Sequence, residues 1–291
     1  MNARGVCGVV VTFRPQASVC DNLAKLVPQV DGLVVVDNGS SAESLAPIHA
    51  AEQGLGFTLI QNGSNVGIAA ALNIGVRWAK ARGFRYVALF DQDSAVTEGF
   101  MLAMVAEYES HPQRDKVAIV TPSQVERSTC RARGQWSTKD GSPLVAITSG
   151  SLMPLEIFDQ CGWFQEEFII DCVDHEYCLR ARSLGYTLAE CRQAVLLVAV
   201  GSITSHQAFG FTIHARHYGA NRRYYMTRNR LVMVHRFWKE QPAWCWRTLQ
   251  DIVQDSIRVA LVEEERWSKM RHTGQGIVDA LCGRMGKVVE L

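Results

Sequence analysis

The sequence predicts an α/β fold with a mainly parallel, twisted sheet flanked by helices, and two features indicate it. Runs rich in β-branched residues, typical of strands, occupy residues 6–13 and 32–40. A helical pattern lies between them, from Ser18 to about Val30, and Pro28 is expected to end this helix. Strands that alternate with helices form βαβ units, in which successive strands run parallel. With 291 residues, the chain is long enough to bury a sizeable core.

The same alternation continues along the next part of the chain. An Ala-rich helix pattern ends in a basic turn before Gly83, a residue that fits a helix C-terminus. We expect strands at 57–62, 84–93 and 116–125 and helices at 68–83 and 98–110. These elements extend the predicted parallel sheet.

The last part of the chain changes character. Residues 126–143 read as a polar loop, and a helix is expected from about Val173 to Ser183. Beyond Trp238, apolar residues recur at helical spacing with charges between them, namely Leu249, Ile252, Val253, Ile257, Ala260 and Leu261. We therefore predict a main domain over residues 1–239 and a helical C-terminal extension over 240–291.

Composition limits the classes of function. Lysine and arginine (30) nearly balance aspartate and glutamate (29), so no overall basic field argues for nucleic acid as a partner. Nine cysteines without a CxxC pair favour reduced thiols and a cytoplasmic protein. The longest strongly apolar run, 194–200, is too short to span a bilayer. We expect a soluble protein or one attached peripherally to the inner face of the cell membrane.

Three predicted strands end in polar residues. These ends are TFR at 12–14, DNGS at 37–40 and DQD at 91–93. In parallel α/β sheets ligands bind outside the carboxyl ends of the strands, so these three ends are expected to meet at one site. A single aspartate such as Asp37 would also suit a helix cap or a turn, and that alternative stays open.

Asp91 and Asp93 form a pair of closely spaced carboxylates. Two carboxylates that flank one residue at an apolar strand end repel each other unless a cation neutralises them. Carboxylates together with a phosphate-bearing substrate are the ligands that Mg²⁺ or Mn²⁺ prefers. The pair therefore predicts a divalent metal site, although DxD alone is a common sequence.

A small-residue segment follows the third strand. Asn65 and Gly67 stand directly before the Ala-rich helix, where an amide side chain and turn N–H groups can reach an anion or a sugar. A tight loop before a close-packed helix is the alternative for the later Ala and Gly positions.

Seven motifs in order resemble a known family. VVVTFR, VVVDNGSS, NVGIAAALNIG, LFDQDS, SGSLM, GWFQEEFIIDCVDHEYCLRARSLGY and RRYYMTRNRL stand in the order found in glycosyltransferases of family 2. The likeness runs from about Val6 to Arg236 and is greatest to bacterial rhamnosyltransferases that use dTDP-L-rhamnose. It implies a GT-A fold with a Rossmann-like sheet, inverting sugar transfer and a divalent ion on the donor diphosphate.

The resemblance also assigns residues. It implies that the nucleotide-sugar donor contacts Thr12, Phe13, Arg14, Asp37, Asn65, Gly67, Asp91 and Gln92, and that Asp93 is the direct metal ligand beside Asp91. Asp174 falls in the position of the catalytic aspartate, which removes a proton from the acceptor hydroxyl. Asp171 and Glu176 are the accompanying acidic residues. The alternative is that Asp174 caps a helix while Asp171 or Glu176 pairs with Arg180 or Arg182.

A basic and aromatic stretch at 214–237 completes the expected site. Such a run could also be a solvated helix face or a nucleic-acid surface, but beside a DxD motif a diphosphate cradle is the better interpretation. The candidates are Arg222, Arg223, Arg228 and Asn229.

One position departs from the family. Similar enzymes commonly carry a histidine after the strand that follows the base helix, and Val198 stands there in this chain. Either His206 or His217 substitutes for it, or aspartate and diphosphate hold the metal alone.

The sequence thus predicts an inverting glycosyltransferase that moves L-rhamnose from dTDP-L-rhamnose to a hydroxyl of a glycan or lipid-linked acceptor, in the synthesis of a cell-surface polysaccharide, lipopolysaccharide or glycolipid. The alternatives are a UDP-sugar donor, such as one carrying galactofuranose or glucose, and a non-catalytic nucleotide-sugar or glycan-binding protein. Trp244, Trp246 and the segment 249–261 suggest contact with a membrane or a lipid-linked acceptor, and a helical lid or a homodimer face remains an equal alternative.

Overall fold

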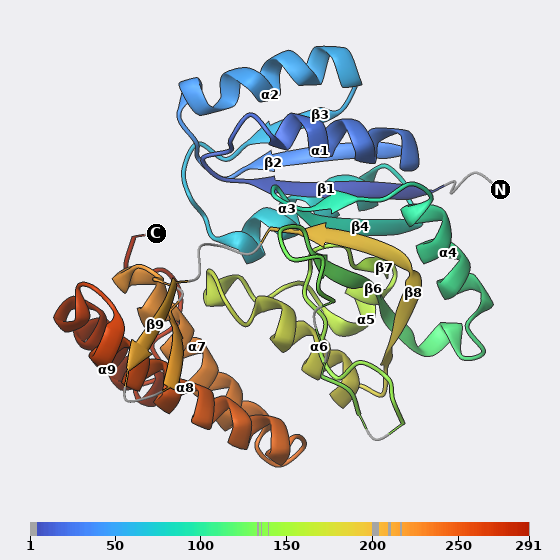
Figure 1. The fold of residues 1–291 in the computed structure, drawn as a ribbon. Helices are drawn as coiled ribbons and strands as arrows, with labels where there is room; N and C mark the ends of the chain where they lie inside the picture. Colours follow the sequence, from blue (N-terminus) through green and yellow to red (C-terminus); the bar gives the residue numbers. More distant parts are fainter. Residues whose placement is uncertain are drawn as a thin grey trace. The chain divides into compact units, whose positions relative to one another are not determined.

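The computed structural model contains an eight-stranded sheet with the order β3-β2-β1-β4-β7-β6-β8-β5 (Figure 1). Its strands are β1 (Val6–Thr12), β2 (Gly32–Asp37), β3 (Thr58–Gln61), β4 (Tyr86–Asp91), β5 (Ala95–Val96), β6 (Val117–Glu126), β7 (Leu152–Pro154) and β8 (Thr187–Val198). The pairs β1–β2, β1–β4, β2–β3 and β6–β8 are parallel, whereas β7 and β5 run antiparallel to their neighbours. The predicted mainly parallel α/β fold is confirmed.

The structure describes residues 5–132, 134, 136–138, 140–199, 204–208, 211–215 and 217–290, with the backbone alone for 204–208 and 211–215. Within the latter ranges, β9 (Thr204–Ala208) and β10 (Phe211–Ala215) form a separate antiparallel pair. The helices are α1 (Val19–Leu26), α2 (Ala42–Leu55), α3 (Ile68–Ala81), α4 (Phe100–Ser110), α5 (Ile157–Cys161), α6 (Val173–Ser183), α7 (Ala220–Phe237), α8 (Pro242–Val262) and α9 (Arg266–Leu281).

Helices cover both faces of the sheet because neighbouring strand residues point to opposite sides. Val10 of β1 belongs to a buried cluster with side chains of α1, α2 and α4. Val9, on the other face, packs against α3, where a Cβ on Gly75 would come within 2.3 Å of Val9 Cγ1. A glycine at this position of α3 thus lets the helix lie close to β1, as the small-residue segment predicts.

The described contacts divide the chain into two compact units. The first comprises residues 1–165 and 177–199 and contains the large sheet, and the second comprises 166–176 and 200–291 and contains α7, α8 and α9. Helix α6 contributes residues to both units. The C-terminal helical region is confirmed, and the predicted boundary at residue 239 stays a prediction.

Several local predictions are confirmed and others were incomplete. Helix α6 has the predicted bounds, and α1 ends before a 3₁₀ turn that contains Pro28. Helix α2 was not predicted, because its hydrophobic periodicity is weak and because Pro47, a residue that disfavours helix interiors, stands inside it. Its N-terminus is nevertheless capped by Ser41, whose hydroxyl accepts a hydrogen bond from the Ser44 amide.

Candidate functional site

The carboxyl ends of β1, β2 and β4 lie level with one another. Thr12 of β1 is paired with Asp37 of β2, and Val11 is paired with Asp91 of β4. The expectation that TFR, DNGS and DQD meet at one edge of the sheet is therefore confirmed. We call this set of strand ends and the loops that follow them the carboxyl edge.

Asp37 is buried and organises the loop after β2. Its Oδ1 accepts hydrogen bonds from the hydroxyls of Thr12 (3.1 Å) and Ser40 (2.6 Å). Its Oδ2 accepts from the backbone N–H groups of Gly39 (3.0 Å) and Ser40 (2.8 Å). Four donors match the four lone-pair sites of a carboxylate, so Asp37 fixes the loop in the shape that the structure shows.

A second loop is joined to the first by asparagines. Asn38 donates to Asn65 Oδ1 (3.0 Å) and accepts from the Val66 amide (3.0 Å). Asn65 Oδ1 also accepts from the Gly67 amide (3.0 Å) at the start of α3. Gly39, with φ of 90°, allows the two loops to approach, since its Cβ would lie 2.4 Å from the Ser64 carbonyl carbon. Asn65 and Gly67 are thus brought to the carboxyl edge.

Gln92 links the DQD segment to the end of β1. Its side chain accepts from the Phe13 amide (2.9 Å) and donates to the Phe13 carbonyl (3.1 Å). The amide of Arg14 donates to Ser40 Oγ (2.8 Å), and the Arg14 guanidinium lies 4.7 Å from the Phe13 ring centroid. Phe13, Arg14 and Gln92 therefore hold neighbouring segments together, and the exposed Arg14 head group remains accessible.

Asp91 and Asp93 occupy different surroundings at this edge. The Asp91 amide donates to Ser149 Oγ (3.0 Å), which holds the end of β4. Desolvation raises the pKa of the Asp93 carboxyl above its ordinary value, and the Arg127 guanidinium partly opposes this rise. Arg127 donates to the Asp93 carbonyl oxygen (3.4 Å) and to Asn22 Oδ1 (3.3 Å). A cation beside Asp93 would favour its ionised form.

Few described side chains are placed to bind a metal ion. Among the residues that the structure describes, no group of three or more His, Cys, Asp and Glu side chains could hold a metal ion. Val198 is the buried last residue of β8, and His217 is half-buried with φ of 48°. The predicted alternative ligand His206 has its side chain outside the described residues. Asp91 and Asp93 remain a fit for Mg²⁺, which commonly takes one or two carboxylates together with substrate phosphates.

The second unit contains the predicted acidic residues on a strained loop. We call residues 166–172 the acidic loop. Ile169, Asp171 and Cys172 have φ of 63°, 61° and 65°, in the left-handed region that residues with side chains rarely adopt. Helix α6 begins directly afterwards, so this loop sets the position of Asp174 in the first turn.

The three acidic residues differ in their partners. Asp171 accepts two parallel bonds from Arg222, both at 3.1 Å, and the buried Glu176 pairs with Arg236 at 2.9 Å. Asp171 thus pairs with Arg222, where the alternative interpretation expected Arg180 or Arg182. Arg180 donates to the carbonyls of Cys161 and Trp163. Arg182 likewise bonds to carbonyls near the polar loop.

Asp174 is half-buried, and its Oδ1 accepts from the His175 amide (2.8 Å). Across the described parts of the chain, no basic side chain bonds to its carboxylate. Of the three acidic side chains, it is therefore the one whose carboxylate is left without a cation partner in this part of the structure.

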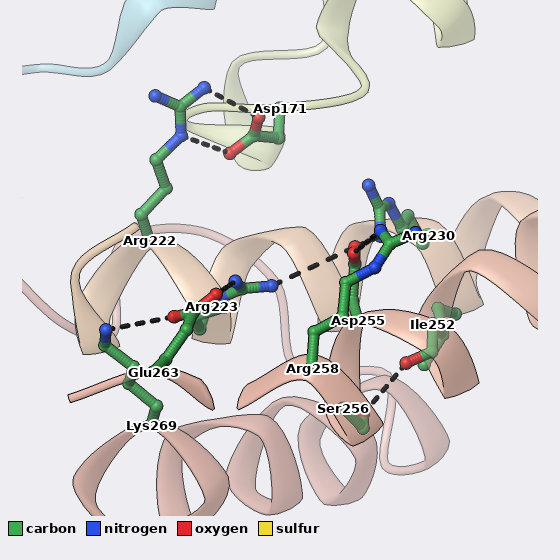
Figure 2. A network of polar contacts seen from close by, with 10 residues as sticks. All are labelled: Asp171, Arg222, Arg223, Arg230, Ile252, Asp255, Ser256, Arg258, Glu263 and Lys269. Carbon is green, nitrogen blue, oxygen red and sulfur yellow. Dashed lines mark hydrogen bonds and ion pairs between the residues drawn. The ribbon is translucent and has the colours of Figure 1, made fainter. Parts of the chain in front are cut away.

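The arginines of α7 differ from the predicted diphosphate cradle. Figure 2 shows Arg222 and Arg223 directed to different partners. Arg223 is buried and pairs with Glu263 at 2.5 Å, and Glu263 also accepts from Lys269 at 3.0 Å. Arg228 and Asn229 are fully buried and bond mainly to backbone carbonyls. The structure gives these three residues internal partners, because α7 turns this face toward the other helices and the acidic loop.

The comparisons identify the family. Residues 9–164, more than half of the chain, match the sequence model of Glycosyl transferase family 2. The chain belongs to glycosyl transferase family 2. Among curated relatives of this family 2 protein is the dTDP-rhamnosyl transferase RfbF of Shigella flexneri, which is 26% identical over 299 residues and matches 97% of this chain and 96% of the relative.

Solved structures agree with the family 2 fold. TarS from S. aureus superposes with a TM-score of 0.63 at 13% identity, covering 96% of this chain and 81% of that one. The mannosyltransferase PcManGT from Pyrobaculum calidifontis, in complex with GDP-Man and Mn²⁺, gives a TM-score of 0.62 at 15% identity, covering 96% and 88%. The GT-A fold follows from these neighbours, and nucleotide-sugar transfer as the general activity follows from the family.

Sequence reasoning missed several residues that shape these regions. Asn38 is buried at the end of β2, and its position inside DNGS was the available signal. Ser149 stands in the SGSLM motif but received no role. Arg127 lies in the polar loop, where nothing in the sequence connects it with Asp93.

Proposed function

We propose that this family 2 glycosyltransferase transfers L-rhamnose from dTDP-L-rhamnose, with inversion, to a hydroxyl of a glycan or lipid-linked acceptor in the synthesis of a cell-surface polysaccharide, lipopolysaccharide or glycolipid. The observation that carries the proposal is the similarity to RfbF, which extends over 97% of the chain rather than over one motif. The fold neighbours do not select the donor, because TarS is bound to UDP-GlcNAc and PcManGT to GDP-Man.

The carboxyl edge is the proposed donor site. Asp37 and Asn38 fix the loops that carry Asn65, and Gln92 fixes the backbone of Phe13. A rigid set of loop amides and hydroxyls at strand ends suits recognition of a nucleoside diphosphate. Thr12, Arg14, Gly67 and Asp91 complete the proposed donor contacts.

A divalent ion, Mg²⁺ or Mn²⁺, is the proposed cofactor, and Asp93 with Asp91 would hold it. When bound, the ion supplies positive charge against the charge that develops on the departing diphosphate. Asp93 is exposed and only its pKa reflects a partial loss of solvent, and a nearby cation would offset the cost that raises this pKa. Arg127, whose guanidinium lowers the same pKa, adds fixed positive charge beside Asp93.

Asp174 is the proposed general base. A base must accept the proton of the acceptor hydroxyl as that oxygen attacks the anomeric carbon. Asp171 and Glu176 are each bound to an arginine, whereas no basic side chain in the described structure bonds to Asp174. This difference favours Asp174 over its two acidic neighbours.

The test of donor identity is a calorimetric titration of the purified protein with thymidine, uridine and guanosine diphosphates, each with and without Mg²⁺ or Mn²⁺. Preferred binding of the thymidine nucleotide, tighter with metal, is the expected result. Preference for uridine diphosphate would replace the sugar and keep the reaction class. Absence of nucleotide binding under every condition would favour a non-catalytic glycan-binding protein.

The segment 240–291 is proposed to contact the acceptor, a membrane surface or a second copy. Among the described residues of α8, one exposed stripe holds Trp246, Val253, Ile257 and Leu261. None of the described helices has the length and apolar character needed to cross a bilayer. Trp246→Ser with Ile257→Ser tests the surface better than truncation, because truncation would remove Glu263 and Asp255, which both pair with the buried Arg223. Unchanged liposome binding and unchanged mass in solution would reject the membrane and dimer alternatives.

A further inference from the structure

Asn229 of α7 holds the acidic loop through its backbone. The Asn229 amide nitrogen donates to the carbonyl oxygens of Phe168 (2.8 Å), Ile170 (2.7 Å) and Asp171 (3.0 Å). Its Oδ1 accepts from Arg228 Nε (3.0 Å). An amide carries two hydrogens, so three acceptors share them and no donor of the amide is left for a ligand.

Arg228 supports the loop from the adjacent position. Its Nη2 donates to the Glu167 carbonyl (3.1 Å) and its Nη1 to the Gly286 carbonyl (2.7 Å) in the C-terminal tail. The Gly286 amide closes this connection by donating to the same Glu167 carbonyl (2.9 Å). Arg228 is fully buried, and each of its three guanidinium nitrogens is engaged. Contact with a diphosphate would require these bonds to break.

The hydrogen bonds from Asn229 of α7 reach the part of the acidic loop in which the backbone is strained. Ile169 and Asp171 adopt left-handed φ values, and Asn229 bonds to carbonyls directly before and after Ile169 and at Asp171 itself. Such conformations persist when the surroundings over-determine them, and they cluster at functional sites. The Ile169 side chain adds to this restraint, because it packs in a buried cluster with Tyr224 and Tyr225 of α7.

Arg222 restrains the same loop from its exposed side. It grips the Asp171 carboxylate with two parallel bonds, so Asp171 is held at its backbone by Asn229 and at its side chain by Arg222. Three residues later, Asp174 stands in the first turn of α6. A shift of the acidic loop would therefore move the carboxylate that we assign as the base.

We propose that Asn229 and Arg228 are positioning residues that act through Asp174: they hold the acidic loop in its strained form and so place the base, and they do not contact the donor diphosphate. This proposal rests on the proposed role of Asp174. It replaces the phosphate cradle that the basic stretch of the sequence predicts with an internal support for the base.

The test begins with Asn229→Asp. This change keeps the size of the side chain and the acceptor for Arg228 Nε, but sets a carboxylate oxygen against three carbonyl oxygens. We expect kcat to fall about 10- to 100-fold, because small displacements of a catalytic group have effects of this size. The Kd for thymidine diphosphate is expected to stay within about twofold of wild type. A diphosphate contact would instead weaken nucleotide binding.

A double-mutant cycle with Asp174→Asn shows whether the effect passes through the base. If Asn229 acts through Asp174, the double variant is as slow as Asp174→Asn alone. Losses that multiply, or a clear rise in the nucleotide Kd, would overturn the positioning role. An unchanged rate for Asp174→Asn would overturn the proposed base, whereas a slow Asp174→Asn with a normal Asn229→Asp would overturn the positioning role alone.

Asn221→Asp is the matched control. It makes the same exchange on the same helix, at an exposed asparagine whose amide donates to the Glu290 carbonyl. Its kcat and nucleotide Kd are expected to match wild type. Should Asn229→Asp fail to fold, the surface variant Arg222→Gln releases Asp171 with little risk to folding. We expect it to lower kcat several-fold at constant nucleotide Kd, and a wild-type kcat would count against the proposal.

Discussion

The carboxyl edge and the acidic loop both contain acidic residues, but different parts of the chain hold them in place. At the carboxyl edge, Asp37 is fixed by donors from its own loop and from the adjacent strand end, and β1 and β2 are paired in register as far as Thr12 and Asp37. In the acidic loop the backbone is strained, and its restraints come from α7, some sixty residues later in the chain. Bonds within the Asp37 loop and to the adjacent strand shape this part of the carboxyl edge, whereas side chains of α7 hold the loop before Asp174, the proposed base.

The largest expected effect is on the transfer rate and tests the proposed role of Asp174 as the base. Asp174→Asn removes the proposed base while keeping the size of the side chain, so we expect the transfer rate to fall about 10²- to 10⁴-fold. Single-turnover assays with saturating donor measure this rate. A rate within threefold of wild type would show that another group takes the proton.

The second prediction concerns the ion network behind α7. Glu263→Gln leaves the buried Arg223 and Lys269 without their shared carboxylate, and we expect the free energy of unfolding to fall by about 3–5 kcal/mol. Chemical denaturation measures the change. The control Asp251→Asn breaks an exposed pair with Arg247 and should cost less than about 1 kcal/mol. Equal losses in the two variants would contradict the distinction.

A third change weakens the carboxyl edge itself. Asp37→Asn converts a charged acceptor of four hydrogen bonds into a neutral amide, and we expect a loss of about 1.5–3 kcal/mol in the free energy of unfolding. The nucleotide Kd should rise with it, because the loop loses its shape. Asp115→Asn, at an aspartate whose side chain is 94% exposed, is the control and should change neither quantity.

The smallest effect concerns pH. The pKa of Asp93 is raised in the folded protein, so ionisation of this group weakens the fold as pH rises from the unfolded to the folded pKa. Asp93→Asn should therefore raise the free energy of unfolding at pH 7, by less than about 1 kcal/mol because solvent screens the exposed carboxylate. The difference should vanish below about pH 3, where both states are protonated. Destabilisation at pH 7 would show that Asp93 has a favourable partner.

The difference between the two regions also explains what the sequence could predict. The ends DNGS and DQD could be predicted because each apolar strand changes to polar residues where it ends. Parallel pairing then brings these ends level. The partner of Asp171 was not readable, because Arg222 follows 51 positions later and Arg180 or Arg182 looked equally suitable. The burial of Arg223 and Arg228 was hidden for the same reason, since a basic run looks alike whether it faces solvent or a helix.

The most direct test of the division of labour is a parallel titration of thymidine diphosphate with Mg²⁺ into the wild type, Asp93→Asn and Asp174→Asn. The account predicts that Asp93→Asn weakens binding about tenfold or more, in line with the loss of a charged interaction of about 1.5–3 kcal/mol. Asp174→Asn should bind like the wild type. Normal binding by Asp93→Asn together with weak binding by Asp174→Asn would contradict the assignment of donor binding to the carboxyl edge and of the base to the helix after the acidic loop.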